Sequence, residues 1–237
     1  MKCAAICLAA GQGKRMGSSV QKQFLLLNEK PVLYYSLKAL QDSFIEEIIL
    51  VVSENEIEYC KKEIVEKYSF SKVTQIVAGG KERYHSVFQG LTALQEAKPE
   101  YVFIHDGARP FIDQEILERG LKGVETYEAC VIGMPVKDTI KIADEDGNCL
   151  ETPARDRVWM IQTPQIFVYT EITEAYTQLI EAEKVNKSIP KVTDDAMVAE
   201  YFLQKKIHFV KGSYENIKLT TPEDLEIAKA FLKKQKK

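Results

Sequence analysis

The 237-residue sequence lacks the cysteine and histidine patterns of metal-binding and disulfide-stabilised proteins. Its five cysteines are scattered and odd in number, none forms a C-x-x-C pair, and the three histidines lie away from any cysteine pair. These absences argue against a structural zinc site and against a disulfide framework. We therefore expect reduced thiols, as in a cytoplasmic protein.

Long apolar runs and a large excess of one charge are also missing. No segment approaches the roughly 18 consecutive apolar residues of a membrane span, and the N-terminal run CAAICLAA gives way at once to GQGKR. The formal net charge of −3 offers no general attraction for nucleic acid or an acidic membrane, so we expect neither as a partner. The hydrophobic content of 45% is that of a globular protein with a full core.

The first half of the chain alternates between short apolar runs and amphipathic segments. Pro31 suits the first turn of a helix, and Leu33, Leu37 and Leu40 then share one helical face. Such alternation predicts a parallel sheet with right-handed crossovers. We expect strands within 4–10, 46–53, 73–80, 101–110 and 129–136, and helices within 31–41, 54–68, 82–97 and 113–127.

This rhythm breaks after Pro135. Residues 137–162 carry short strand-like pieces around Asp146-Gly147, a favoured hairpin turn. We interpret about 137–158 as a β-arm inserted between sheet elements, and an ordinary surface hairpin is the alternative.

Alternation resumes in the last third of the chain. We expect helices near 170–183 and 194–205, a strand at 206–212 and a final helix from Pro222. The sequence thus predicts one α/β domain over 1–237. Its fold is a Rossmann-like, open, mostly parallel sheet with helices on both faces and a projecting β-arm.

Three polar, glycine-containing stretches follow expected strands: GQGKRMG, AGGKERYHS and HDGARP. Ligands of open parallel sheets bind beyond the carboxyl ends of the strands, so we expect the three stretches to converge. The first stretch does not fit a dinucleotide motif, because Met16 takes the position of the third glycine. It does not fit a P-loop either, because Leu8 stands where that motif has its first glycine and Arg15 where it has a serine or threonine. Its amides can still cradle a polyphosphate beside Lys14, Arg15 and Lys22, although a tight turn with solvated cations is the alternative.

Asp106 directly follows an apolar strand and is expected to face the glycine loop. A carboxylate there can hold a divalent metal that bridges phosphates, or it can simply pair with Arg109. His105 fits a packed, hydrogen-bonded residue better than a catalytic base. Because no Ser-His-Asp or Cys-His order indicates a covalent nucleophile, the pattern favours phosphoryl or nucleotidyl transfer.

Motifs along the whole chain resemble one family. In order from about residue 3 to 232, the chain carries LAAGQGKRM with Lys22, AGGKERYHSV, HDGARPF, PVKDTIK, ARDRVWMIQTPQIF, TDDAMVAEY and NIKLTTPEDLEIA. It closely resembles the 2-C-methyl-D-erythritol 4-phosphate cytidylyltransferases, the CTP-using enzymes of the non-mevalonate isoprenoid pathway. The resemblance implies a nucleotidyltransferase that uses Mg²⁺ and joins CTP to 2-C-methyl-D-erythritol 4-phosphate by in-line attack on the α-phosphate. Its products would be 4-diphosphocytidyl-2-C-methyl-D-erythritol and pyrophosphate.

The resemblance also assigns roles to residues of this chain. Arg15 and Lys22 match the cations that stabilise the α-phosphate transition state, and Asp106 matches the carboxylate that helps hold Mg²⁺. Catalytic roles are further implied for Arg155 and Lys218, with Arg155 coming from the other subunit of a homodimer joined through the β-arm. The implied acceptor-binding residues are Arg109, Thr139, Arg155 and Lys218. The implied CTP-binding residues are Ala9, Ala10, Gly11, Gly13, Lys22, Gly80, Arg83, Ser86 and Asp106.

Two other functions fit parts of the pattern. A ribitol-5-phosphate cytidylyltransferase shares the fold and the CTP chemistry, but Ala10 and Trp159 favour the methylerythritol enzyme. A CTP-binding regulator without turnover would lack the transition-state cations, yet Arg15 and Lys22 are present. One departure from the family is Gln21, which precedes Lys22 where proline is usual and is expected to give Lys22 more freedom.

Overall fold

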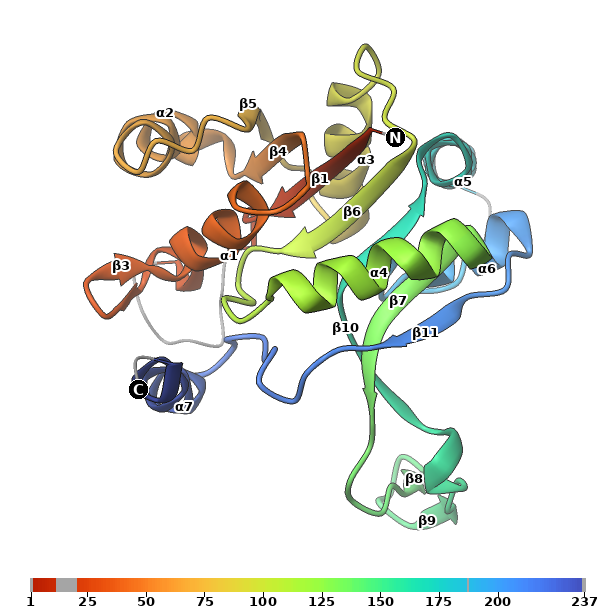
Figure 1. Ribbon diagram of the computed structural model, residues 1–237. Coiled ribbons are helices and arrows are strands. Elements are labelled where there is room, and N and C mark those ends of the chain that lie inside the picture. Colours follow the sequence, from red (N-terminus) through yellow and green to blue (C-terminus); the bar gives the residue numbers. More distant parts are fainter. Residues whose placement is uncertain (1, 12–20, 187, 236–237) are drawn as a thin grey trace.

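The computed structural model describes residues 2–11, 21–186 and 188–235. Within these residues a seven-stranded sheet has the order β11-β7-β10-β6-β1-β4-β5 (Figure 1). Neighbouring strands run parallel except β10, which is antiparallel to both β6 and β7. The strands are β1 (Cys3–Leu8), β4 (Glu47–Val52), β5 (Val73–Ala78), β6 (Tyr101–Asp106), β7 (Ala129–Pro135), β10 (Trp159–Val168) and β11 (His208–Lys211).

The predicted mostly parallel α/β fold is confirmed, but the sequence analysis missed β10 as a strand of the main sheet. It assigned the start of this segment to the strand-like pieces near the arm. Residues 162–167 of β10 are buried without interruption, but four of them, the QTPQ stretch at 162–165, are polar or proline and break the apolar run that marks a strand buried on both faces. This strand passes directly into a helix at Tyr169 and therefore leaves no turn signal.

Helices cover both faces of the sheet (Figure 1). They are α1 (Val32–Gln41), α3 (Arg83–Ala93), α4 (Gln114–Tyr127), α5 (Tyr169–Lys184), α6 (Asp195–Leu203) and α7 (Pro222–Gln235). The helix expected at 54–68 is present with three successive geometries: a 3₁₀ turn η3 (Glu54–Glu56), α2 (Ile57–Tyr59) and a π-helical segment η4 (Cys60–Glu66). None of the helices in the described ranges has the length and apolar character needed to cross a membrane.

Alternation along the strands divides the core into two layers. On β1, Ala5 and Cys7 pack with side chains of α1 and α4, whereas Ala4 and Ile6 pack with side chains of α3, α5 and α6. Burial of both faces explains why β1 and β4 read as continuous apolar runs. A smaller cluster joins Leu27, on the short β2 (Leu26–Leu27), to Leu232 of α7. β2 pairs with β3 (Lys30–Pro31).

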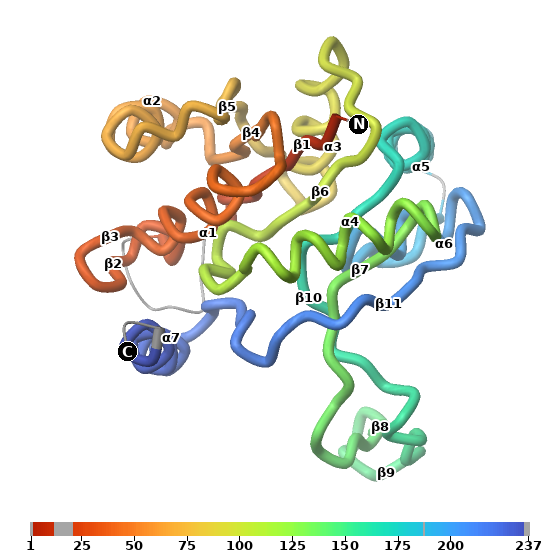
Figure 2. The backbone as a smooth tube through the Cα atoms, in the orientation of Figure 1, coloured from red at the N-terminus to blue at the C-terminus, as the bar shows by residue number. Residues whose placement is uncertain are grey.

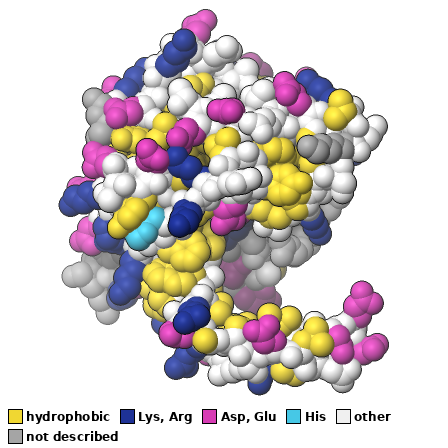
Figure 3. All heavy atoms as spheres, turned by 90° about the vertical axis from the view of Figure 1, so that its right-hand side faces the viewer, with side chains coloured by type: hydrophobic (Ala, Val, Ile, Leu, Met, Phe, Trp, Pro, Cys, Tyr) yellow, Lys and Arg dark blue, Asp and Glu magenta, His cyan; other side chains and the backbone are white. Residues whose placement is uncertain are grey.

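Between β7 and β10 the chain leaves the sheet as a projecting arm (Figures 1 and 2). The arm contains β8 (Ile142–Ala143), β9 (Cys149–Glu151) and the 3₁₀ turn η5 (Arg155–Arg157). Its turn is at the predicted position, because Gly147 has a φ of 86° that favours glycine. Figure 3 shows the arm standing away from the body with apolar side chains along it, and Ile142 and Leu150 are exposed.

Candidate active site

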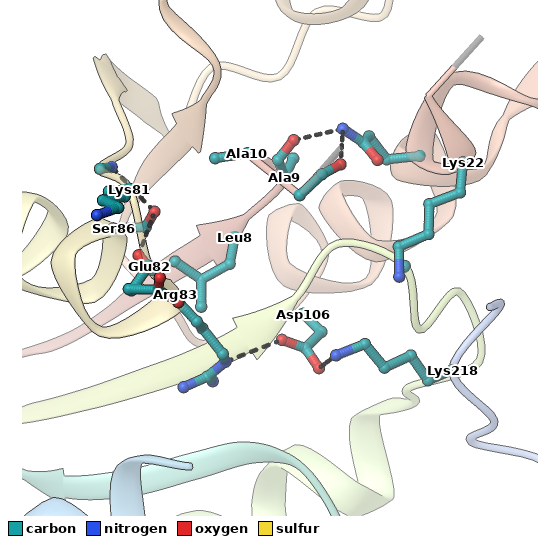
Figure 4. A pocket seen from close by; sticks show the side chains of 14 residues that line it. Leu8, Ala9, Ala10, Lys22, Lys81, Glu82, Arg83, Ser86, Asp106 and Lys218 are labelled. Atoms are coloured by element: carbon teal, nitrogen blue, oxygen red, sulfur yellow. Dashed lines mark hydrogen bonds and ion pairs between the residues drawn. The ribbon is translucent and has the colours of Figure 1, made fainter. Parts of the chain in front are cut away.

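A cavity of about 720 Å³ lies where the carboxyl ends of β1, β5 and β6 meet, at the edge that the strand order predicts for a ligand (Figure 4). All three glycine-containing stretches contribute to its walls, so their predicted convergence is confirmed. Its lining consists of Leu8, Ala9, Ala10, Gly11, Lys22, Gln23, Gly80, Lys81, Glu82, Arg83, Ser86, Asp106, Ala108 and Lys218.

Lys22 enters this cavity from the 3₁₀ turn η2 (Lys22–Phe24). Figure 4 shows its side chain extending toward Asp106 and Lys218. Facing it is the chain that leaves β1, where the Ala9 amide donates to the Val51 carbonyl at 2.7 Å and prolongs the β1–β4 pairing by one residue. The cavity therefore has a fixed backbone wall on one side and a cationic side chain on the other.

The turn between β5 and α3 is closed by its own hydrogen bonds. The Gly80 amide donates to Ser86 Oγ at 3.1 Å, and that hydroxyl donates to the Glu82 carbonyl at 3.4 Å. A side chain at Gly80 would place its Cβ 2.3 Å from the His85 Cβ, so only glycine fits. The Glu82 amide donates to His85 Nδ1 at 3.2 Å, which leaves the proton on Nε2 to bond Glu183 of α5 at 2.7 Å. The shape of the turn is thus held by hydrogen bonds within the protein.

Asp106, at the end of β6, is the anionic centre of the site. Lys218 Nζ lies 2.8 Å from one carboxylate oxygen and Arg109 Nε lies 3.7 Å from the same oxygen. Arg83 Nε lies 3.6 Å from the other. Burial raises the pKa of the Asp106 carboxyl, but the charges of Lys218, Arg83 and Arg109 outweigh burial and hold this pKa well below its usual range. Pairing with Arg109 was one of the predicted alternatives, and it occurs here together with Lys218.

His105 is a buried, neutral neighbour of this centre. Burial lowers the pKa of its imidazole to about 4. Thr163 Oγ1 accepts from the Asp106 amide at 3.0 Å, so its own hydrogen points to His105 Nδ1, also at 3.0 Å. His105 Nε2 then donates to the Arg109 carbonyl at 3.2 Å. The expectation that His105 is packed and hydrogen-bonded is confirmed, and its contacts hold the backbone on both sides of Asp106.

A second cavity of about 330 Å³ shares Arg83, Asp106 and Lys218 with the first. These three residues therefore form the boundary between the two cavities. Its lining is completed by Arg109, Ile161, Gln162, Thr163, Gln165, Thr193 and Asp194.

Arg83 is held at this boundary by the start of α6. Its two Nη atoms each lie 2.7 Å from a carboxylate oxygen of Asp195, which is fully buried, and the Tyr176 hydroxyl donates to the same carboxylate. The Gln165 side-chain oxygen accepts from the Asp195 amide at 2.9 Å. Burial lowers the pKa of the Arg83 guanidinium, but Asp195 raises it well above its ordinary value, so Arg83 remains charged.

Lys218 is positioned by backbone contacts of its loop. The adjacent Leu219 amide donates to the Ala108 carbonyl at 2.9 Å. Two residues before Lys218, the side-chain amide of the buried Asn216 donates to the Thr163 carbonyl at 2.9 Å. The backbone carbonyl of Asn216 accepts from Arg109 Nη1, also at 2.9 Å. One loop thus fixes both cations next to Asp106.

Most of the predicted site residues come together. Two of them, Gly13 and Arg15, lie outside the described residues. Within the described chain, Thr139 and Arg155 line neither cavity, because both lie on the arm, where Arg155 donates to the Lys137 carbonyl at 3.0 Å. Those that line the first cavity are Ala9, Ala10, Gly11, Lys22, Gly80, Arg83, Ser86, Asp106 and Lys218, and Arg109 lines the second.

The sequence analysis missed Gln23, Thr163 and Asp195. The last two belong to the TPQ and TDDA stretches that carried the family resemblance, which was the available signal. Asp194 caps α6, because its carboxylate accepts from the Met197 amide at 3.0 Å. Its neighbour Asp195 turns inward instead, which no local pattern indicates.

The described residues of the site can supply only part of the ligands that a divalent cation needs. No group of three or more His, Cys, Asp and Glu side chains within the described ranges could hold a metal. Asp106 offers one carboxylate and already faces three cations. An ion here would need most of its oxygen ligands from a bound phosphate chain, as magnesium ions commonly do.

Comparisons with known proteins show the family of the chain. The family model for 2-C-methyl-D-erythritol 4-phosphate cytidylyltransferase matches residues 3–234. The enzyme of that name from Lachnoclostridium phytofermentans is 49% identical to the chain, over 98% of this chain and 97% of that enzyme. The one from Lachnospira eligens is 50% identical, over 97% of this chain and 98% of that enzyme. The crystal structure of 4-diphosphocytidyl-2C-methyl-D-erythritol synthase from Anaerococcus prevotii superposes with a TM-score of 0.83 at 36% identity, covering 98% of this chain and 96% of that one. Because these matches cover nearly every residue, the chain belongs to the 2-C-methyl-D-erythritol 4-phosphate cytidylyltransferase family of nucleotidyltransferases, which act in isoprenoid biosynthesis.

Proposed function

We propose that this chain transfers the cytidylyl group of CTP to 2-C-methyl-D-erythritol 4-phosphate. The observation that carries the proposal is the pair of cavities joined at Arg83, Asp106 and Lys218. The larger has room for a nucleotide and the smaller for a short polyol phosphate. Cations at their boundary lie where two phosphate groups would meet.

The reaction needs no general base, because the nucleophile is already an anion. A phosphate oxygen of the acceptor forms a bond to the α-phosphorus of CTP while the bond to the β-phosphate oxygen breaks, and pyrophosphate leaves. Negative charge grows on the equatorial oxygens, so Lys22, Lys218 and Arg15 would stabilise the transition state more than the ground state. The neutral, internally bonded His105 agrees with a mechanism without a histidine base.

CTP binding is assigned to the walls of the larger cavity. The amides of Ala10 and Gly11 and the side chain of Lys22 would hold the phosphates. The turn at Gly80 and Ser86 would contact the base, since the Ser86 hydroxyl oxygen retains a lone pair after accepting from Gly80. Arg83 would contact the nucleotide from the boundary.

Mg²⁺ is proposed as the cofactor, with Asp106 as its protein ligand. When bound, it would neutralise charge on the triphosphate oxygens. The Asp106 carboxylate could contact the ion after the Lys218 ammonium, 2.8 Å away, turns toward a phosphate.

The acceptor would occupy the smaller cavity against Arg109 and Lys218. Thr139 and Arg155 would complete it from the arm of a second subunit, which supports a homodimer because both residues lie away from the cavities of their own chain. A cytoplasmic location remains a prediction from the cysteine pattern.

The test is a comparison of acceptors. The protein is incubated with CTP, Mg²⁺ and either 2-C-methyl-D-erythritol 4-phosphate or ribitol 5-phosphate, and pyrophosphate is measured. We expect release only with the methylerythritol substrate. Release with ribitol 5-phosphate alone would reassign the acceptor, and CTP binding without release from either would indicate a regulator.

A further inference from the structure

Lys22 lies between two glutamines whose side chains are bonded to each other. Gln23 is 1% exposed, and its amide nitrogen donates to the Gln21 side-chain oxygen and to the Ala9 carbonyl. The Gly11 carbonyl lies 3.3 Å from the same nitrogen. One amide group therefore joins the segment that leaves β1 to the segment that carries Lys22.

Gln21 is itself anchored on its other side. Its amide nitrogen donates to Glu56 of η3 at 3.3 Å, so its oxygen is directed to Gln23. Backbone bonds from Phe24 to the Gln21 carbonyl and from Leu25 to the Lys22 carbonyl, at 2.9 and 3.3 Å, close η2. Lys22 is thus flanked by two tethered residues, which is the opposite of the freedom expected from the loss of proline.

The chemistry of this contact requires an amide. The Ala9 and Gly11 carbonyls and the Gln21 oxygen are all acceptors, so the group between them must donate twice. A glutamate of the same shape would bring a fourth acceptor toward these three, and methionine would leave the nearly buried Ala9 carbonyl without its partner. Gln23 also lines the cavity, so its amide is part of the wall rather than of the apolar core.

We propose that Gln23 is a positioning residue for Lys22, an inference that rests on the proposed function. It holds the segment from Ala9 to Gly11, whose amides at Ala10 and Gly11 would bind the phosphates, in a fixed relation to the backbone of Lys22. Cations stabilise a transition state best when their position is set before charge develops, because no reorganisation then opposes them.

A double-mutant cycle tests the proposal. Turnover and the KM for CTP are measured at saturating acceptor for the wild type, Gln23→Met, Lys22→Ala and the double variant. We expect Gln23→Met to lower kcat by about ten-fold with a smaller change in KM, and to lower it by less than about two-fold when Lys22 is already alanine. Equal losses in both backgrounds, or no loss with Lys22 present, would overturn the inference.

Two further variants separate positioning from folding. Gln114→Met removes a similar amide-to-carbonyl bond, 2.9 Å to Ala39, far from the cavities, and should leave kcat unchanged. Gln21→Met removes the acceptor of Gln23 without adding the proline that is usual in the family, and it should lower kcat even if Gln23→Met fails to fold. Unaltered turnover in Gln21→Met would count against the tether. If Lys22→Ala itself keeps full turnover, the failure lies in the proposed role of Lys22 rather than in Gln23.

Discussion

Arg83 and Asp195 form a two-pronged ion pair, with each Nη atom 2.7 Å from a different carboxylate oxygen. Asp195 is fully buried, whereas the Arg83 side chain is 30% exposed in the wall of the cavities. Such forked geometry fixes the plane of the guanidinium as well as its distance. The pair therefore links the fold of α6 to the boundary of the site.

Asp195→Ala is expected to destabilise the protein and to weaken CTP binding. Removing the buried partner leaves Arg83 with the more distant Asp106 carboxylate, 3.6 Å away, and leaves the buried Tyr176 hydroxyl without its acceptor, which costs on the order of 3 kcal/mol. Urea unfolding measures the stability and a CTP titration measures the affinity. Glu115→Ala, which removes an exposed pair with Arg119 at 3.5 Å, should change stability by less than about 1 kcal/mol. Similar losses in both variants would contradict the role of burial.

Lys22→Ala is expected to cut turnover on the order of 10²-fold or more while CTP affinity falls much less, because the ammonium would act mainly on charge that develops in the transition state. Single-turnover kinetics separate the two quantities. Lys38→Ala removes a lysine that is exposed and paired with Asp42, and it serves as the control. Equal effects on affinity and turnover would show that Lys22 binds CTP without stabilising the transition state.

Arg155→Ala is expected to raise the KM for the acceptor, because Arg155 would bind it across subunits. When Arg155→Ala and Lys22→Ala chains are mixed in equal amounts, half of the dimers are mixed and each of these has one intact site. About a quarter of wild-type activity should therefore return. Native mass spectrometry confirms that mixed dimers form. Mixed dimers without activity would show that each chain completes its own site.

His105 is expected to make stability depend on pH in mildly acidic solution. Its pKa is about 4 in the folded protein against an ordinary 6.5, so between these values only the unfolded chain takes up the proton. The free energy of unfolding should fall by about 3 kcal/mol as pH drops through this window. The measurement is urea unfolding at several pH values. His105→Gln should show a shallower fall, whereas parallel curves for the wild type and His105→Gln would refute the assignment.

The sequence predicted the parts of this protein that depend on local pattern. Apolar runs located strands such as β1 and β4, and the rule for parallel sheets correctly brought Asp106 and Lys22 to one edge. It could not predict contacts between segments far apart in the chain. Arg83 and Asp195 are 112 residues apart, and each looks locally like an ordinary surface charge near a helix start.

Gln23 was missed for a different reason. A single glutamine after a lysine carries no pattern of its own, and its role arises only when β1 and η2 pack together. The antiparallel strand β10 was missed because its QTPQ stretch, 162–165, is polar and contains proline, so it interrupts the apolar run by which β1 and β4 were found.

The two cavities have a balance of charge opposite to that of the whole chain. Among the described residues, five cationic side chains and three carboxylates line them, a surplus of two positive charges in a protein whose formal net charge is −3. The positive charges that line the cavities therefore attract anions locally, against the negative charge of the whole chain. Capture of a polyanion should consequently slow as ionic strength rises, even though the protein as a whole is acidic.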